Sequence, residues 1–173
     1  MYKLSDITRT EVFFTSYLHH AFIASPLLFE RLLLKSIGVN NKTSIIDSSY
    51  ELCLFRDAAK SGYMNTRENK SFEKVTFDNV FILSDNSIII VEAKAQQGFN
   101  SKQIKNLEHA KEKIKNSALP WNKAYLIGLC SSKYSPKEDT AKKFDAIITW
   151  ADVADCFDNE RMIFSRADSI YNN

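Results

Sequence analysis

The chain has 173 residues, a formal net charge of +2, and 45% hydrophobic residues. That length fits one domain with a substantial core, and the composition is typical of globular proteins. Because glycine (4 residues) and proline (3 residues) are scarce, collagen-like, linker-like and disordered chains are excluded. The near-neutral charge gives no bulk argument for a nucleic-acid partner, which would have to bind at a local basic patch.

The cysteines and the apolar segments bear on the compartment. Cys53, Cys130 and Cys156 lie far apart with no CxxC pair, so neither a zinc site nor a disulfide framework is indicated. Thiols scattered through apolar runs suit a reducing cytosol. The N-terminal residues lack a signal-peptide core, and no apolar stretch reaches membrane-spanning length. We expect a soluble cytoplasmic protein without a membrane partner, folded as a single domain over residues 1–173.

The first part of the chain is expected to be helical and then extended. A first helix is predicted from residue 5 or 6 to about residue 24, and a second stretch, LLFERLLLKSIG, ends at Gly38. Alternating β-branched residues from Ser44 to Arg56 indicate a strand. The polar segment from Asp57 to Glu73 is expected to be irregular.

The second part predicts a hairpin followed by alternating helices and strands. Two apolar runs, VTFDNVFIL and SIIIVEAKA, are separated by turn residues and indicate a β-hairpin. A Lys-rich helix is predicted over residues 101–118, then a strand AYLIGLC, a short helix over residues 136–143, a strand AIITW and further helix. This order predicts an α/β fold with a central mixed sheet of four or five strands, flanked by helices.

The residues that could carry out catalysis lie on the hairpin. The apolar strand IIIV runs directly into Glu92 and Lys94, which point to one face because strand side chains alternate, while Ala93 points to the other. Asp78 opens the preceding strand. Two close carboxylates repel each other unless a cation lies between them, and oxygen ligands suit Mg²⁺. A neighbouring lysine can orient a metal-bound water or stabilise charge on a phosphate, so these parts together are suited to phosphodiester hydrolysis.

If Asp78 and Glu92 share one metal site, the length of the hairpin loop is restricted. A two-residue turn at Asp85-Asn86 would pair Asp78 with Ala93, on the face opposite Glu92. Directly paired residues share a face, and a one-residue slip reverses it. The loop must therefore contain an odd number of residues, or a bulge or splay must re-aim Asp78.

Asp78, followed after thirteen residues by Glu92-Ala93-Lys94, resembles the D-x(n)-(D/E)-x-K signature of the PD-(D/E)xK nuclease superfamily. The resemblance covers the element order over residues 44–150, with Phe77 in place of the proline that often precedes the aspartate. It implies a restriction-endonuclease-like fold and a metal-dependent endonuclease that acts on DNA and leaves 5′-phosphate ends. It also implies that Asp78, Glu92 and the carbonyl of Ala93 hold Mg²⁺ or Mn²⁺, and that Lys94 aligns the attacking water.

Two further residues follow from the same resemblance. Relatives often carry a glutamate on the first helix, and Glu11 lies there on an otherwise apolar stripe, where a carboxylate must be paired, metal-bound or near the rim. It would bind metal through water or hold a second metal. Gln103 matches a glutamine that helps hold the site, although Leu107 stands where the longer pattern has a tyrosine. The alternatives are a partly exposed helical glutamate and a structural glutamine.

Other functions stay open beside the nuclease. The charged hairpin end could simply be solvated, and the lysines of the helix predicted over residues 101–118 are typical of a solvated helix face. A second hypothesis is a non-cleaving nuclease-fold DNA-binding module, or an accessory subunit of a restriction, defence or recombination system that needs a partner protein. A chain of this size that cuts both strands of a duplex would act most simply as a homodimer.

Overall fold

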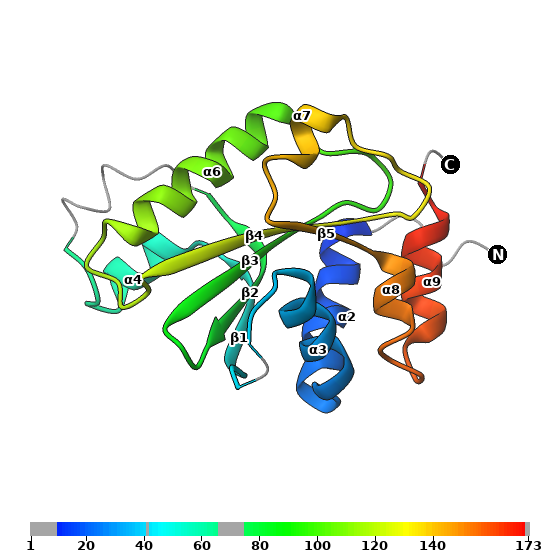
Figure 1. The fold of residues 1–173 in the computed structure, drawn as a ribbon, viewed down its shortest axis with the longest axis horizontal. Helices are drawn as coiled ribbons and strands as arrows, with labels where there is room; N and C mark the ends of the chain where they lie inside the picture. Colours follow the sequence, from blue (N-terminus) through cyan, green and yellow to red (C-terminus); the bar gives the residue numbers. More distant parts are fainter. Residues whose placement is uncertain (1–9, 41, 66–74, 172–173) are drawn as a thin grey trace.

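The computed structural model describes residues 10–40, 42–65 and 75–171 (Figure 1). Its centre is one five-stranded sheet in the order β1-β2-β3-β4-β5. The strands are β1 (Ile45–Leu52), β2 (Phe77–Leu83), β3 (Ser87–Ala93), β4 (Lys123–Cys130) and β5 (Ala146–Thr149). The first three strands pair antiparallel and the last three parallel, so the sheet is mixed.

Helices cover both faces of this sheet (Figure 1). One face packs against α2 (Thr10–Ala24), α3 (Leu27–Ser36), α8 (Trp150–Ala154) and α9 (Arg161–Ser169). The other face packs against α4 (Leu54–Lys60) and α6 (Ser101–Lys115), with the short α7 (Glu138–Ala141) beside α6. The predicted α/β class and the mixed sheet of four or five strands between helices are confirmed, and the sheet has five strands.

The central strand β3 divides the apolar interior into two cores. Ile89 and Val91 pack in the core with α2, α3, α8 and α9, whereas Ile88 and Ile90 pack in the core with α4 and α6. A strand covered on both faces needs a continuous apolar run rather than an alternating one, which explains the sequence IIIV. Glu92, which follows in the same alternation, belongs to the face that carries Ile88 and Ile90.

The β2–β3 loop has three residues, from Ser84 to Asn86. The N–H of Asn86 donates to the carbonyl of Leu83 at 3.1 Å, and Asn86 has a φ of +62°, as expected for a three-residue hairpin loop that ends in the left-handed region. The ladder pairs Asn79 with Val91, and one step further in this register stand Asp78 and Glu92. The loop is therefore odd, and the two carboxylates share a face.

The strand predicted over residues 44–56 is too long. It ends at Leu52, after Glu51 has taken a φ of +50°, and α4 begins at Leu54. The Asp57 carboxylate accepts a hydrogen bond from the N–H of Cys53 at 3.2 Å, which satisfies a donor at the start of this helix. Residues 57–60 are thus helical, not irregular, while residues 66–73 of that segment, like the start of the first helix, lie outside the described residues.

Smaller corrections concern the ends of other elements. The helix predicted over residues 101–118 ends at Lys115, and the short helix predicted over residues 136–143 is confined to α7. Trp150 begins α8 instead of ending β5, because Thr149 and Asp152 form a capping box. In that box the Thr149 hydroxyl accepts from the N–H of Asp152 at 3.1 Å, and the carboxylate of Asp152 accepts from the N–H of Thr149 at 2.8 Å.

Among the described residues, no single helix is long and apolar enough to cross a membrane. Helices α2 and α3 pass that test only when taken together across a bend of 113°, on length and composition alone. Phe14, Leu18, Phe29 and Leu33 of these helices are buried in the core, whereas Ile23, Leu27 and Leu28 are exposed.

The left-handed backbone of Asn86 gives a test of the hairpin. Asn86→Gly should leave the free energy of unfolding unchanged or slightly higher, because glycine adopts this φ without strain. Asn86→Val should lower it by about 1–2 kcal/mol, since a β-branched side chain is disfavoured there. Urea unfolding measures both, and equal stability of the valine and glycine variants would contradict the left-handed backbone of Asn86.

Candidate active site

The ammonium group of Lys94 lies between two carboxylates at the end of β3. Its Nζ is 2.8 Å from Oε1 of Glu92 and 3.1 Å from Oε2 of Glu11. Lys94 and Glu92 are buried, with 8% and 1% of their side chains exposed, whereas Glu11 is 30% exposed. One lysine thus joins the end of the central strand to the first turn of α2.

The Glu92 carboxylate is buried and poorly satisfied. Within the described residues neither of its oxygens has a hydrogen-bond partner of normal geometry, although Lys94 stands at ion-pair distance. The pKa of Glu92 is raised to about 8, chiefly by burial and then by the charge of Asp78, while Lys94 opposes both effects. A carboxylate whose ionised form remains disfavoured beside a lysine is short of positive charge.

Asp78 faces the same end of the sheet from β2. Its Oδ2 accepts a hydrogen bond of 2.7 Å from the N–H of Ala93. The pKa of Asp78 is raised to about 6: burial is the largest cause and Glu11 adds to it, while the bond from Ala93 and the charge of Lys94 lower it. Two neighbouring carboxyl groups whose pKa values are both raised indicate a position at which a bound cation would be stabilised.

Lys94 remains charged in this setting. Burial alone lowers the pKa of Lys94, but the charge of Glu92 at 2.8 Å and the charges of Glu11 and Asp78 raise it above its ordinary value. Lys94 is therefore a fixed positive charge and cannot act as a base while these carboxylates are ionised. Its chemistry is limited to orienting a bound group and stabilising negative charge.

Two buried side chains hold the site together. The Nδ2 of Asn79, next to Asp78, donates to the carbonyl of Thr15 at 3.1 Å and so ties β2 to α2, one turn beyond Glu11. The indole N–H of Trp150 donates to the carbonyl of Lys94 at 3.0 Å. Asn79 and Trp150 were not singled out from the sequence, because nothing in their spacing shows which distant backbone they meet.

Glu51 is a further carboxylate near the site that sequence reasoning missed. The pairs Tyr50–Asn79 and Leu52–Phe77 place it beside Asp78, and its charge is among those that raise the pKa of Asp78. Its φ of +50° is rare for a residue with a side chain. A charged residue near the end of a strand was the only available signal, since the strand pairing that gives it meaning is not visible in the sequence.

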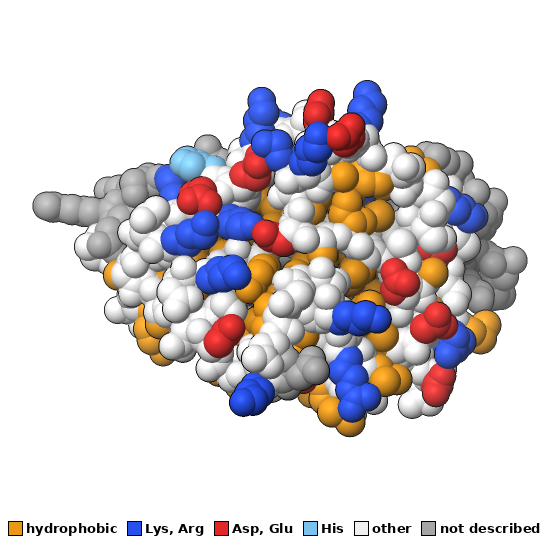
Figure 2. All heavy atoms as spheres, in the orientation of Figure 1, with side chains coloured by type: hydrophobic (Ala, Val, Ile, Leu, Met, Phe, Trp, Pro, Cys, Tyr) orange, Lys and Arg blue, Asp and Glu red, His pale blue; other side chains and the backbone are white. Residues whose placement is uncertain are grey.

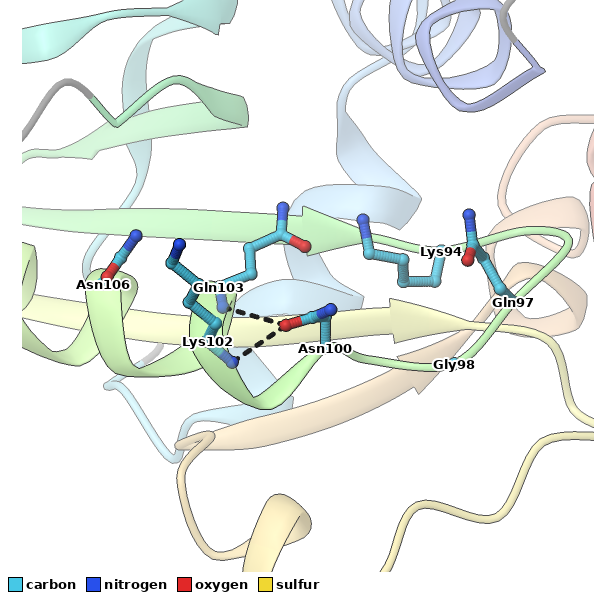
Figure 3. Close-up of a pocket in the computed structure, with 7 residues that line it drawn as sticks. All are labelled: Lys94, Gln97, Gly98, Asn100, Lys102, Gln103 and Asn106. Atoms are coloured by element: carbon cyan, nitrogen blue, oxygen red, sulfur yellow. Dashed lines mark hydrogen bonds between the residues drawn. The ribbon is translucent and has the colours of Figure 1, made fainter.

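Gln103 lies on the first turn of α6 and lines a pocket together with Lys94 (Figure 3). The hydrogen bonds drawn there are those that Asn100 Oδ1 accepts from the N–H groups of Lys102 and Gln103, which cap the helix. The structure therefore brings Gln103 to the rim of the site without a drawn bond to Lys94. The catalytic roles of all five predicted residues stay predictions.

The ligand types present fit a hard divalent cation. Among the described residues, no group of three or more His, Cys, Asp or Glu side chains is arranged to hold a metal ion. Mg²⁺, however, usually binds through one or two carboxylates and keeps several waters. Asp78 and Glu92 lie on one face and both have raised pKa values, and the carbonyl of Ala93 follows Glu92 in the chain. These are the kinds of ligand that Mg²⁺ uses.

Comparisons with models of protein families, with curated proteins and with solved structures find no match to this chain.

The raised pKa of Glu92 predicts how stability depends on pH without divalent ions. A carboxyl whose pKa is higher in the folded chain keeps its proton more tightly when folded, so stability falls as pH rises from the ordinary value of 4.5 towards 8. Glu92→Gln should remove this loss and raise Tm at pH 8 by about 2–4 °C, the shift that about 1 kcal/mol produces. At pH 4 the parent and the variant should melt together. A Tm difference that does not change with pH would contradict the assigned environment.

Proposed function

We propose that this chain is a metal-dependent nuclease of the PD-(D/E)xK superfamily, with a restriction-endonuclease-like fold, that hydrolyses phosphodiester bonds in DNA. One observation carries this function: Glu92 is buried with no hydrogen bond to either carboxylate oxygen from the described residues, on the face shared with Asp78 and beside Lys94. Such a group is stabilised by a divalent cation, and the three side chains together have the chemistry that phosphodiester hydrolysis needs.

In this function Asp78, Glu92 and the carbonyl of Ala93 would hold Mg²⁺ or Mn²⁺. The ion would supply a water of lowered pKa and neutralise charge on the phosphate. Lys94 then orients the attacking water and stabilises the negative charge that develops on the phosphate oxygens. Glu11 also pairs with Lys94 and would accept a hydrogen bond from a water bound in the site. Gln103 would contact the phosphate or Lys94 from α6.

Cleavage is expected to leave a 5′-phosphate and a 3′-hydroxyl. A duplex cut in both strands requires two sites, which a homodimer supplies most simply. Calcium should support DNA binding better than hydrolysis, because its larger and looser coordination shell fits the reaction geometry poorly.

A non-cleaving binding module or accessory subunit is the second candidate. Its specific support is that Lys94 already pairs with both Glu92 and Glu11, so this end of the sheet has a partial counter-charge without a metal. Such a protein would bind DNA, or a partner protein, and would not cut DNA alone.

Replacing Lys94 separates these functions. The parent should cleave plasmid or single-stranded DNA with Mg²⁺ or Mn²⁺, and Lys94→Ala should cut about 10²–10³-fold more slowly, the usual loss for one electrostatic contact in a preorganised site. Without divalent ions the variant should also melt at a lower temperature, because Glu92 loses its only ion-pair partner among the described residues. Added Mg²⁺ should restore much of that difference, because the ion takes over the counter-charge.

The matched control is Lys105→Ala, an exposed lysine on α6 outside the site, which should cut at the parental rate. An active parent whose Lys94→Ala variant cuts at an unchanged rate would overturn the proposed mechanism. Metal binding by a parent that cuts no DNA would favour the accessory subunit.

A further inference from the structure

A polar pocket of about 350 Å³ opens beside Lys94, between the end of β3 and the first turns of α6 (Figure 3). None of the described residues that line it is acidic. Its lining combines a glycine with two lysines, Lys94 and Lys102, and four carboxamides, Gln97, Asn100, Gln103 and Asn106. In Figure 3 the side chains of Lys94, Lys102, Gln103 and Asn106 point to the same side of the pocket.

Lys102 has no ion-pair partner among the described residues, unlike Lys111 and Lys115 on the same helix. Lys111 and Lys115 on α6 pair with Asp145 and Glu112, and Figure 2 shows lysines and carboxylates interspersed over α6 and α7. In the described part of the chain no ion pair includes Lys102. It lies in the first turn of α6, where no acidic residue offsets the positive end of the helix dipole.

The loop that forms the other wall is held in place by packing. A Cβ at Gly98 would lie 2.5 Å from the ring of Tyr134, so only glycine allows this approach. The N–H of Phe99 donates to the Tyr134 hydroxyl at 3.3 Å, and the two rings pack edge to face. These contacts hold the backbone of the loop at Gly98 and Phe99, which favours binding because little of this wall has to be ordered.

We propose that this pocket binds a backbone phosphate of the nucleic-acid strand, next to the phosphate that is cut at Asp78, Glu92 and Lys94. Lys102 supplies the charge and the carboxamides supply N–H donors to the phosphate oxygens. Lys94 is shared by the pocket and the candidate active site, so a strand bound in the pocket continues directly to the reacting position. This subsite rests on the proposed function only for the identity of the neighbouring phosphate.

Salt dependence of binding tests the subsite without any cleavage. Fluorescence anisotropy with a labelled single-stranded oligonucleotide, in EDTA and in Ca²⁺, gives the affinity at several salt concentrations. Lys102→Ala should weaken binding about 10-fold at low salt, and should reduce the slope of log K against log salt by about 0.7, the value for one phosphate contact. Lys105→Ala, on the same helix but outside the pocket, should change neither quantity.

Two further binding measurements identify the chemistry of the ligand. The loss in Lys102→Ala should be equal for oligo(dA) and oligo(dT), because a phosphate contact carries no sequence information. A loss confined to oligo(dA) would assign Lys102 to base recognition and overturn the phosphate subsite. Competition by millimolar inorganic phosphate that is as strong as that by a dinucleotide would assign the pocket to a free anion instead, and would overturn it as well.

The outcomes are separate from those for the proposed nuclease. An unchanged salt slope in Lys102→Ala, or a parent that binds no oligonucleotide, overturns the subsite even if the chain cuts DNA. A reduced slope supports the subsite even if Lys94→Ala shows that the cleavage mechanism is wrong.

Discussion

A carboxylate buried at the end of a central strand needs positive charge, and Glu92 obtains part of it from Lys94. Lys94 is buried where it pairs with Glu92. It also pairs with Glu11, so the start of α2 lies at the same end of the sheet. The raised pKa values of Glu92 and Asp78 mean that this pairing is incomplete. Desolvating a buried ion pair is costly. A buried pair that also lacks positive charge is therefore better explained by ligand binding than by a contribution to stability.

Three other features of the fold hold Glu92, Asp78 and Lys94 in place. The three-residue loop ending at Asn86 sets the register that turns Asp78 and Glu92 to one face. Asn79 joins β2 to α2, and Trp150, at the start of α8, fixes the backbone of Lys94. The sheet and its two apolar cores thus act as a rigid frame, on which sites are held more precisely than on loops.

Part of this could be predicted from the sequence and part could not. The apolar run before Glu92 predicts a strand buried on both faces, and alternation alone puts Glu92 and Lys94 on one face. The hairpin was predictable, but its loop length was not, because Asn86 suits either a two-residue or a three-residue turn. The position of Glu51 and the start of α4 were missed, since both depend on a left-handed backbone at a residue that rarely adopts it.

The most direct measurement of the central claim is calorimetric titration with Mn²⁺ in two buffers of different ionisation enthalpy, which counts the protons released on binding. If Glu92 and Asp78 hold the ion, binding near pH 7 should release about one proton, because Glu92 with its pKa near 8 must ionise to act as a ligand. The release should diminish towards pH 9, and Glu92→Gln should abolish it together with most of the affinity. Absence of binding, or binding with no proton release that Glu92→Gln leaves unchanged, would contradict a cation site at Glu92.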